Sequence, residues 1–331
     1  HVRPKQFKAE TRTEDVCESD VVVVGFEEGG LAAFQISTGN RLWLVDAHNE
    51  DVAALSFSYC DPVFASVSGD ILGDQTTCGM KLWSIKGPEL LSTFPNHHSD
   101  GIMGVQFSPH NSDLVASASF DRSVMVWNAS TGVQVASFVG HSGGVTGLAF
   151  SPENPELIVT SSIDGQVGIW NFVTGESEFV KLDMDGLTAI AFSPFDSDLF
   201  FVGSRAQLSV QRLSTKRTEM TSEEVDGATI YGILFAPVAP LVLVCGTQNL
   251  LAAYSSDTLE LVRKFDGHSD DVTTVCFVPD DPSRVISGSN DRTVRVWSIE
   301  TGKQLQVIDV GRSVWSVAAP RSLGGLVKAA K

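Results

Sequence analysis

Four sets of residues in this 331-residue chain have the composition of a serine-hydrolase triad. Each set combines a histidine, a serine or threonine and an aspartate, and a tryptophan follows. In one set Ser117 lies four residues before Asp121, Trp127 lies six residues after it, and His97 or His98 lies upstream. In a hydrolase, such a set would supply a nucleophile, a general base and the carboxylate that orients the base. The other three sets are His141, Thr160, Asp164 and Trp170; His268, Ser287, Asp291 and Trp297; and His48, Ser66, Asp70 and Trp83.

The recurrence of these sets argues against catalysis. A catalytic site is a single constellation, whereas this combination appears four times, so none of the four is unique. The one stretch with the G-x-S-x-G spacing of a hydrolase nucleophile elbow, Gly140–Gly144, is centred on Ser142, which belongs to none of the four sets. We therefore expect no catalytic residue, and we ask which repeated elements place these side chains.

The tryptophans mark a regular repeat. Trp83, Trp127 and Trp170 end the phrases Lys-Leu-Trp, Met-Val-Trp and Gly-Ile-Trp, at intervals of 44 and 43 residues. Trp297 ends a fourth phrase, Arg-Val-Trp, after three further steps of ~42 residues. A fixed period of this size indicates a repeat architecture.

Each repeat contains four predicted strands. The first is rich in β-formers and ends in a turn signal. A second strand follows (such as Leu114–Ser119 or Val285–Ser289), then a turn with Asp, a third strand that ends at the tryptophan, a Thr-Gly turn and a fourth strand. Four short strands per ~40 residues are typical of one β-propeller blade. The predicted first strands are Val52–Phe57, Ile102–Phe107, Val145–Phe150, Leu187–Phe192, Ile230–Phe235, Val272–Phe277 and a weaker Val314–Ala319.

These phrases resemble the WD40 repeat family over essentially the whole chain. The strongest matches are Asp121–Trp127 and Asp291–Trp297, although the Trp-Asp pair of the family is Trp-Asn or Trp-Ser here. The resemblance implies an all-β propeller in which the four sets are buried structural tetrads of His, Ser or Thr, Asp and Trp. A satisfied buried network of this kind stiffens its blade.

The third-strand positions predict seven four-stranded antiparallel blades, numbered here from the N-terminus. The interval of 49 residues between the first two positions points to an insertion at Ile71–Gly79. The C-terminal strand near Val314–Ala319 would complete the N-terminal three-stranded unit and close the ring. We expect a flexible arm at 1–15, one propeller domain at 16–320 and a tail at 321–331. The seven positions are Phe34, Trp83, Trp127, Trp170, Gln211, Tyr254 and Trp297.

Blades one, five and six lack the tetrad. Blade one has Phe34 with Glu28 in the acidic place, blade five has Gln211, and blade six has Tyr254 with Gln248 in place of the aspartate. Two interpretations stay open: neutral drift, or specialisation of the adjacent blades five and six for a partner.

The second residue of the first strand varies in size between repeats without a pattern. The resemblance implies that it faces the mouth of the central channel, beside the residue that precedes the turn aspartate. Exposed aromatics and methionine suit protein recognition. The expected partner site on this top face contains Trp315, Tyr231, Met103, Phe120, Ile163 and Asn290, with an acidic rim that includes Glu50 and Asp271. The other rim carboxylates are Asp51, Asp100, Asp183, Asp185, Glu223, Glu224, Asp226 and Asp270.

Composition narrows the class of partner. The net charge of −17 and pI of about 4.7 argue against nucleic acid or an anionic membrane as the main ligand. No apolar run approaches the ~18 residues that span a bilayer. The five cysteines form no C-x-x-C pair, so we expect no metal and no cofactor. Their odd number favours reduced thiols and an intracellular protein, cytoplasmic or nuclear.

The leading functional hypothesis is a non-catalytic scaffold. It would be a monomeric propeller that docks proteins or peptides, basic ones in particular, within a multiprotein complex. An alternative is a substrate receptor of a ubiquitin ligase, although the Trp-Asp-x-Arg of many such receptors is replaced here, for example by Trp127-Asn-Ala-Ser. An enzyme propeller is a third hypothesis, but the sequence shows no inward cluster of carboxylates, Tyr and Arg to support it.

Overall fold

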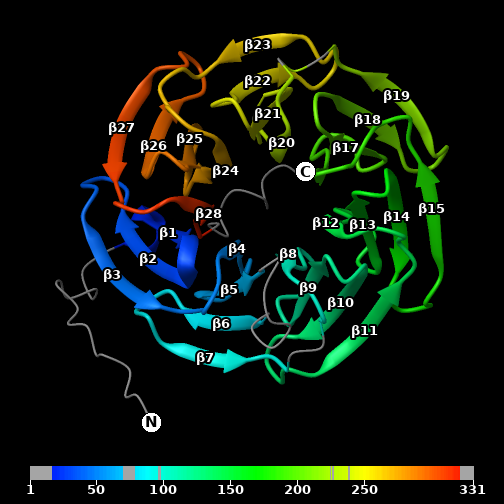
Figure 1. Ribbon diagram of the computed structural model, residues 1–331, viewed down its shortest axis with the longest axis horizontal. Coiled ribbons are helices and arrows are strands. Elements are labelled where there is room, and N and C mark those ends of the chain that lie inside the picture. The colour runs from blue at the N-terminus through cyan, green and yellow to red at the C-terminus, as the bar shows by residue number, and fades with distance from the viewer. Residues whose placement is uncertain are drawn as a thin grey trace.

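Seven four-stranded sheets stand around a central axis like the blades of a propeller (Figure 1). This computed structural model describes residues 17–69, 79–95, 98–223, 225, 227–237 and 239–320. The predicted all-β fold, its seven blades and their four antiparallel strands are confirmed. The predicted arm, the predicted tail and nearly all of the predicted insertion lie outside the described residues.

The first three blades come from the two ends and the first part of the chain. Blade one combines β1 (Val21–Phe26), β2 (Gly30–Gln35) and β3 (Arg41–Asp46) with the C-terminal β28 (Val314–Ala318). Blade two contains β4 (Val52–Phe57), β5 (Val63–Ser68), β6 (Met80–Ser84) and β7 (Leu90–Thr93). Blade three contains β8 (Ile102–Phe107), β9 (Leu114–Ser119), β10 (Ser123–Asn128) and β11 (Gln134–Val139).

The remaining four blades follow in chain order. Blade four contains β12 (Val145–Phe150), β13 (Leu157–Ser162), β14 (Gln166–Asn171) and β15 (Ser177–Lys181). Blade five contains β16 (Ala189–Phe192), β17 (Leu199–Gly203), β18 (Leu208–Arg212) and β19 (Arg217–Thr221). Blade six contains β20 (Ile230–Phe235), β21 (Leu241–Gly246), β22 (Leu251–Ser255) and β23 (Leu261–Lys264). Blade seven contains β24 (Val272–Val278), β25 (Asp281–Ser289), β26 (Thr293–Ser298) and β27 (Gln304–Asp309).

Burial explains the position of each strand within a blade. The two middle strands are almost entirely buried, because each blade packs both faces against its neighbours. The last strand of each blade lies on the perimeter (Figure 1), and there buried and exposed side chains alternate. In β27, Leu305 and Val307 are exposed while Ile308 is buried against blade one.

The ring closes through β28, which pairs antiparallel with β1. Val314 and Val317 pack in the core between blades seven and one. The Ser316 hydroxyl donates to the carbonyl of Val52 in blade two at 2.8 Å. The C-terminal strand is therefore held by three blades, and the predicted closure of the ring is confirmed.

One predicted strand is shorter than expected. We predicted Leu187–Phe192, but β16 begins at Ala189. The Leu187 N–H donates instead to the carbonyl of Ser162 in blade four at 3.1 Å. The Thr188 N–H still donates to the carbonyl of Gly203 in blade five at 2.8 Å, one residue before β16 begins.

Candidate functional site

The residues of three predicted tetrads meet through hydrogen bonds. His98 Nδ1 lies 2.9 Å from Asp121 Oδ2, and His98 Nε2 lies 2.8 Å from Ser117 Oγ. The Trp127 indole N–H donates to the same hydroxyl at 3.0 Å. The Ser117 hydroxyl on β9 thus links the imidazole of His98 to the indole of Trp127 on the neighbouring β10.

The other sets repeat this geometry in blades four, seven and two. The imidazole–carboxylate distances are 3.2 Å for His141 and 2.8 Å for His268. The hydroxyls of Thr160 and Ser287 bond these imidazoles at 2.8 and 2.7 Å and accept from the indoles of Trp170 and Trp297 at 2.9 and 2.8 Å. In blade two, Ser66 bonds both His48 and Trp83, whereas Asp70 lies outside the described residues, as does His97.

The hydroxyl groups of these sets are buried too deeply to reach a substrate. The hydroxyls of Ser117, Thr160 and Ser287 are completely buried, and each already has two partners. A nucleophile must reach its substrate, and these cannot. Burial lowers the pKa of His141 and His268, so both imidazoles are neutral near pH 7.

Other hydrogen bonds occur at the corresponding positions of blades five, six and one, which lack the tetrad. In blade five, the buried Gln211 amide donates to Ser209 at 2.8 Å and accepts from Thr218 at 3.1 Å. In blade six, the turn amide of Gln248 donates to Asp271 Oδ1 at 3.0 Å. In blade one, Asp51 accepts from the amide of Glu28 in the same manner at 2.9 Å.

The variable second residue of the first strand coincides with a β-bulge. In six blades the pairing between the first strand and its neighbour skips one residue, and the skipped residues are Ala53, Met103, Thr146, Tyr231, Thr273 and Trp315. A bulge leaves one residue out of the ladder and can redirect its side chain. The first strands are the innermost strands (Figure 1), and these residues lie near the start of each, around one end of the ring axis, which we call the channel mouth. We call this end, with the loops before the first strands and the turns between second and third strands, the top face.

Threonine at this position joins neighbouring blades. The hydroxyl of Thr146 donates to the carbonyl of Leu187 at 2.9 Å, and that of Thr273 donates to Val314 at 2.7 Å. Thr188, just before β16, likewise donates to Ile230. Ala53, Met103, Tyr231 and Trp315 have no hydroxyl at Cβ and cannot make this bond. The sequence did not reveal this division, because the acceptor belongs to the next repeat.

The predicted partner residues fall into separate groups on the top face. Phe120 and Ile163 flank the Gly143–Gly144 pair, where a Cβ would lie 2.8 Å from Ile163 and 2.4 Å from Phe120. Tyr231 is 42% exposed, and both partial burial and the carboxylate of Asp271 raise its pKa.

A second group joins the loop before β24. The Asn290 amide donates to the Asp271 carbonyl, and its side-chain Oδ1 is buried without a hydrogen bond among the described residues. Met103 and Trp315 are half-buried at their bulges, and Glu50 is half-buried in the loop before β4.

The acidic rim is less uniform than predicted. Asp51 and Asp271 cap turns of neighbouring blades, whereas Asp183, Asp185, Glu223 and Asp270 are exposed. Glu224 and Asp226 lie outside the described residues. The exposed Arg312 interrupts the rim, and its guanidinium lies 3.0 Å from where a Cβ on Gly30 would be. Its place three residues before Trp315 could have revealed this cation from the sequence.

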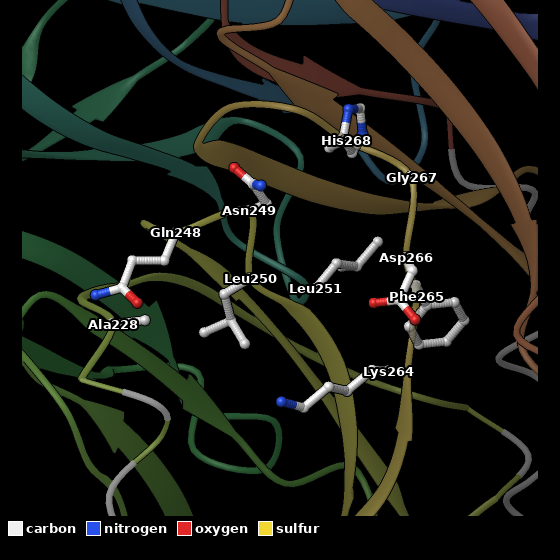
Figure 2. Close-up of a pocket in the computed structure, with 10 residues that line it drawn as sticks. All are labelled: Ala228, Gln248, Asn249, Leu250, Leu251, Lys264, Phe265, Asp266, Gly267 and His268. Atoms are coloured by element: carbon white, nitrogen blue, oxygen red, sulfur yellow. The ribbon is translucent and has the colours of Figure 1, made fainter.

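A pocket of 270 Å³ lies at the outer corner of blade six (Figure 2). We call it the blade-six pocket. Figure 2 shows Leu250 and Leu251 between the Gln248–Asn249 turn and the segment from Lys264 to His268. Sequence reasoning missed this pocket, because its existence depends on where two strands separate.

The part of the chain that the structure describes contains neither a candidate metal cluster nor a helix able to span a membrane. No group of three or more His, Cys, Asp or Glu side chains is placed to hold a metal ion within that part of the chain. None of its helices has the length and hydropathy required to cross a membrane.

Comparison with known proteins agrees with this architecture. The model of the family "WD domain, G-beta repeat" matches residues 88–128, 132–171 and 259–298. Protein groucho of Drosophila melanogaster is 26% identical over 132 residues, which are 40% of this chain and 18% of that protein. Nuclear distribution protein PAC1 of Candida tropicalis is 32% identical over 97 residues, which are 29% of this chain and 18% of that protein.

A third relative matches a shorter segment. Mitochondrial division protein 1 of Saccharomyces cerevisiae is 42% identical over 64 residues, which are 19% of this chain and 8% of that protein. The chain thus covers only a small part of each relative. The repeat matches and the closed ring of seven four-stranded blades together identify the chain as a WD40 repeat protein that forms a seven-bladed β-propeller.

Proposed function

We propose that this protein is a non-catalytic scaffold that docks partner proteins or peptides on its top face. The observation that carries the proposal is that the bulged residues at the channel mouth are of two kinds, those that bond a neighbouring blade and those that do not. Three threonines there join neighbouring blades, whereas Met103, Tyr231 and Trp315 have no such structural bond. Large apolar or aromatic side chains at an open surface are the residues that dominate protein interfaces.

The charge of the top face supports a basic partner. Carboxylates surround the channel mouth, and those of the rim outnumber the exposed arginines of the same loops and turns, Arg122, Arg205, Arg292 and Arg312. Charge complementarity at an interface rim raises the rate of association and selects among partners. We therefore propose a peptide or protein surface that carries Arg or Lys, and a binding affinity that falls as salt is added.

The names of the relatives fit an intracellular role. They include a nuclear distribution protein and a mitochondrial division protein. We propose an intracellular location, cytoplasmic or nuclear, and a monomeric propeller inside a larger complex.

The test compares pools of basic and acidic peptides on the purified protein. The double variant Trp315→Ala with Tyr231→Ala should lose at least about tenfold in affinity for the basic pool, the loss expected when a central aromatic anchor is truncated. The matched control is Leu305→Ala with Val307→Ala, which truncates two exposed apolar side chains on the perimeter. The proposal is wrong if both pools bind equally, or if the top-face variant binds like the control.

A further inference from the structure

The outer strand stays paired to the turn in the blades that carry a complete tetrad. In blade seven, β27 pairs with β26 as far as Thr293 and Asp309. One further bond follows, from the Val310 N–H to the Arg292 carbonyl at 3.0 Å. The ladder of blade four likewise reaches the residue beside its turn aspartate. The outer strand therefore lies beside the turn in these two blades.

Blade six, like blades two and five, has a shorter outer ladder. Its outer strand pairs only as far as Ala252 and Lys264, and the last bond joins the Phe265 N–H to the Leu251 carbonyl at 2.9 Å. Leu250 lies four residues before Tyr254, as Thr293 lies four residues before Trp297, and it has no strand beside it. The chain then turns away, and the blade-six pocket occupies the corner that remains.

The pocket has an apolar floor and a polar rim. Leu250, Leu251 and Phe265 form the floor and are at least nine-tenths buried. Gln248, Asn249, Lys264 and Asp266 are exposed at the rim. Pockets for drug-sized ligands usually measure about 300–1,000 Å³. A volume of 270 Å³ suits one or two side chains of a partner better than a whole small molecule.

A continuous path connects this pocket with the channel mouth. Asp271 Oδ1 accepts a hydrogen bond from the Gln248 amide, which belongs to the rim of the pocket. The same carboxylate helps to raise the pKa of Tyr231 at the bulge of β20. Asp271 therefore lies near both Tyr231 and the Gln248–Asn249 turn at the top of blade six.

We propose that an extended segment of a partner protein crosses the top of blade six along this path. It inserts one aliphatic or aromatic side chain over Leu250, Leu251 and Phe265, and it places a Lys or Arg against Asp271. Charge argues for the basic residue: Asp266, Asp270 and Asp271 outnumber Lys264 in this region. The inference rests on the proposed scaffold function and adds to it an anchor pocket and the chemistry of the segment.

The test selects short random displayed peptides on the intact protein. Enriched sequences should combine an apolar residue with a nearby Lys or Arg. Asp266→Trp places a large indole at the rim over the pocket and should lower their affinity by at least about tenfold. The matched control is Asp309→Trp, because Asp309 occupies the corresponding place in blade seven, where the ladder is longer and the corner is covered. Both aspartates are exposed, so thermal melting should show both variants folded.

A second variant tests the charge without removing the turn cap. Asp271→Asn keeps an oxygen that can accept from the Gln248 amide, and it should weaken binding several-fold at low salt but little at high salt. The inference is overturned if Asp266→Trp binds like the wild type, if Asp309→Trp is equally impaired, or if the enriched peptides lack either residue type. Peptides that are lost only with the Trp315 and Tyr231 double variant would refute the pocket and leave the proposed function standing. No enrichment at all would refute both.

Discussion

Replacing Thr160 with valine tests whether the buried networks hold the blades together. Thr160 is completely buried, it bonds His141 Nε2 at 2.8 Å, and it accepts from the Trp170 indole at 2.9 Å. Valine has nearly the same shape, so Thr160→Val removes the hydroxyl without opening a cavity. An indole N–H and an imidazole nitrogen are then left buried without a partner.

Water cannot replace the lost hydroxyl at this site. A Cβ on Gly168 would lie 2.6 Å from Thr160 Oγ1, 2.6 Å from Trp170 Nε1 and 2.9 Å from His141 Nε2, so the network is packed directly against the backbone of β14. Each buried polar group left unsatisfied costs about 1–3 kcal/mol. We expect Thr160→Val to lower the free energy of unfolding by about 2–6 kcal/mol, the sum for two such groups.

The matched variant is Thr160→Ser, which keeps the hydroxyl and loses one methyl group. The other three sets contain serine here, so the bonds should survive, at a cost of about 1 kcal/mol for the methyl. Urea unfolding followed by tryptophan fluorescence and far-UV circular dichroism measures both variants. If Thr160→Val is as stable as Thr160→Ser, the hydroxyl contributes shape alone and the reasoning is refuted.

Three further predictions follow from the same structure. Gly168→Ala should destabilise blade four strongly, since its methyl would meet the network at 2.6 Å; an unchanged urea midpoint would contradict this. Deleting residues 313–331 removes β28 and exposes the edge of β1, so we expect aggregation or loss of cooperative melting by calorimetry and light scattering; a melt like that of the whole chain would refute closure by this strand. Burial and the nearby Lys81 lower the pKa of His48 from 6.5 to about 3. Its contribution is therefore complete above pH 6.5 and is lost as the pH falls towards 3, with about 2 kcal/mol gone by pH 5. His48→Gln should flatten the dependence of melting temperature on pH over this range, and an unchanged slope would show that another group is responsible.

The period of the tryptophans and the β-rich phrases sufficed to predict the blades. Each strand is a local pattern of a few residues, and the count of third-strand positions gave the number of blades. The closing strand could also be foreseen, because Val314–Ala318 has the pattern of a first strand and no repeat follows it. The prediction was wrong at Leu187 and Thr188, because β16 begins two residues later than the local pattern indicates.

The candidate site depended much more on tertiary structure. The sequence identified the second residue of the first strand as variable, but the bulge at this residue is a property of strand register. The bond from Thr273 to Val314 and the cap of the Gln248 turn by Asp271 join different blades. No local pattern encodes such pairs.

The sequence by itself determined that the chain repeats, how many units it builds and how the ring closes, because these follow from periodic hydrophobicity and turn residues. Only the tertiary structure decided which residues of the top face hold the ring together and which make no such bond. It also decided that the outer ladder of blade six ends at Lys264 and that a pocket lies between the Gln248–Asn249 turn and the segment that follows Lys264. The length of a ladder is set by the competition between strand pairing and the path of the next loop, and that competition takes place in three dimensions.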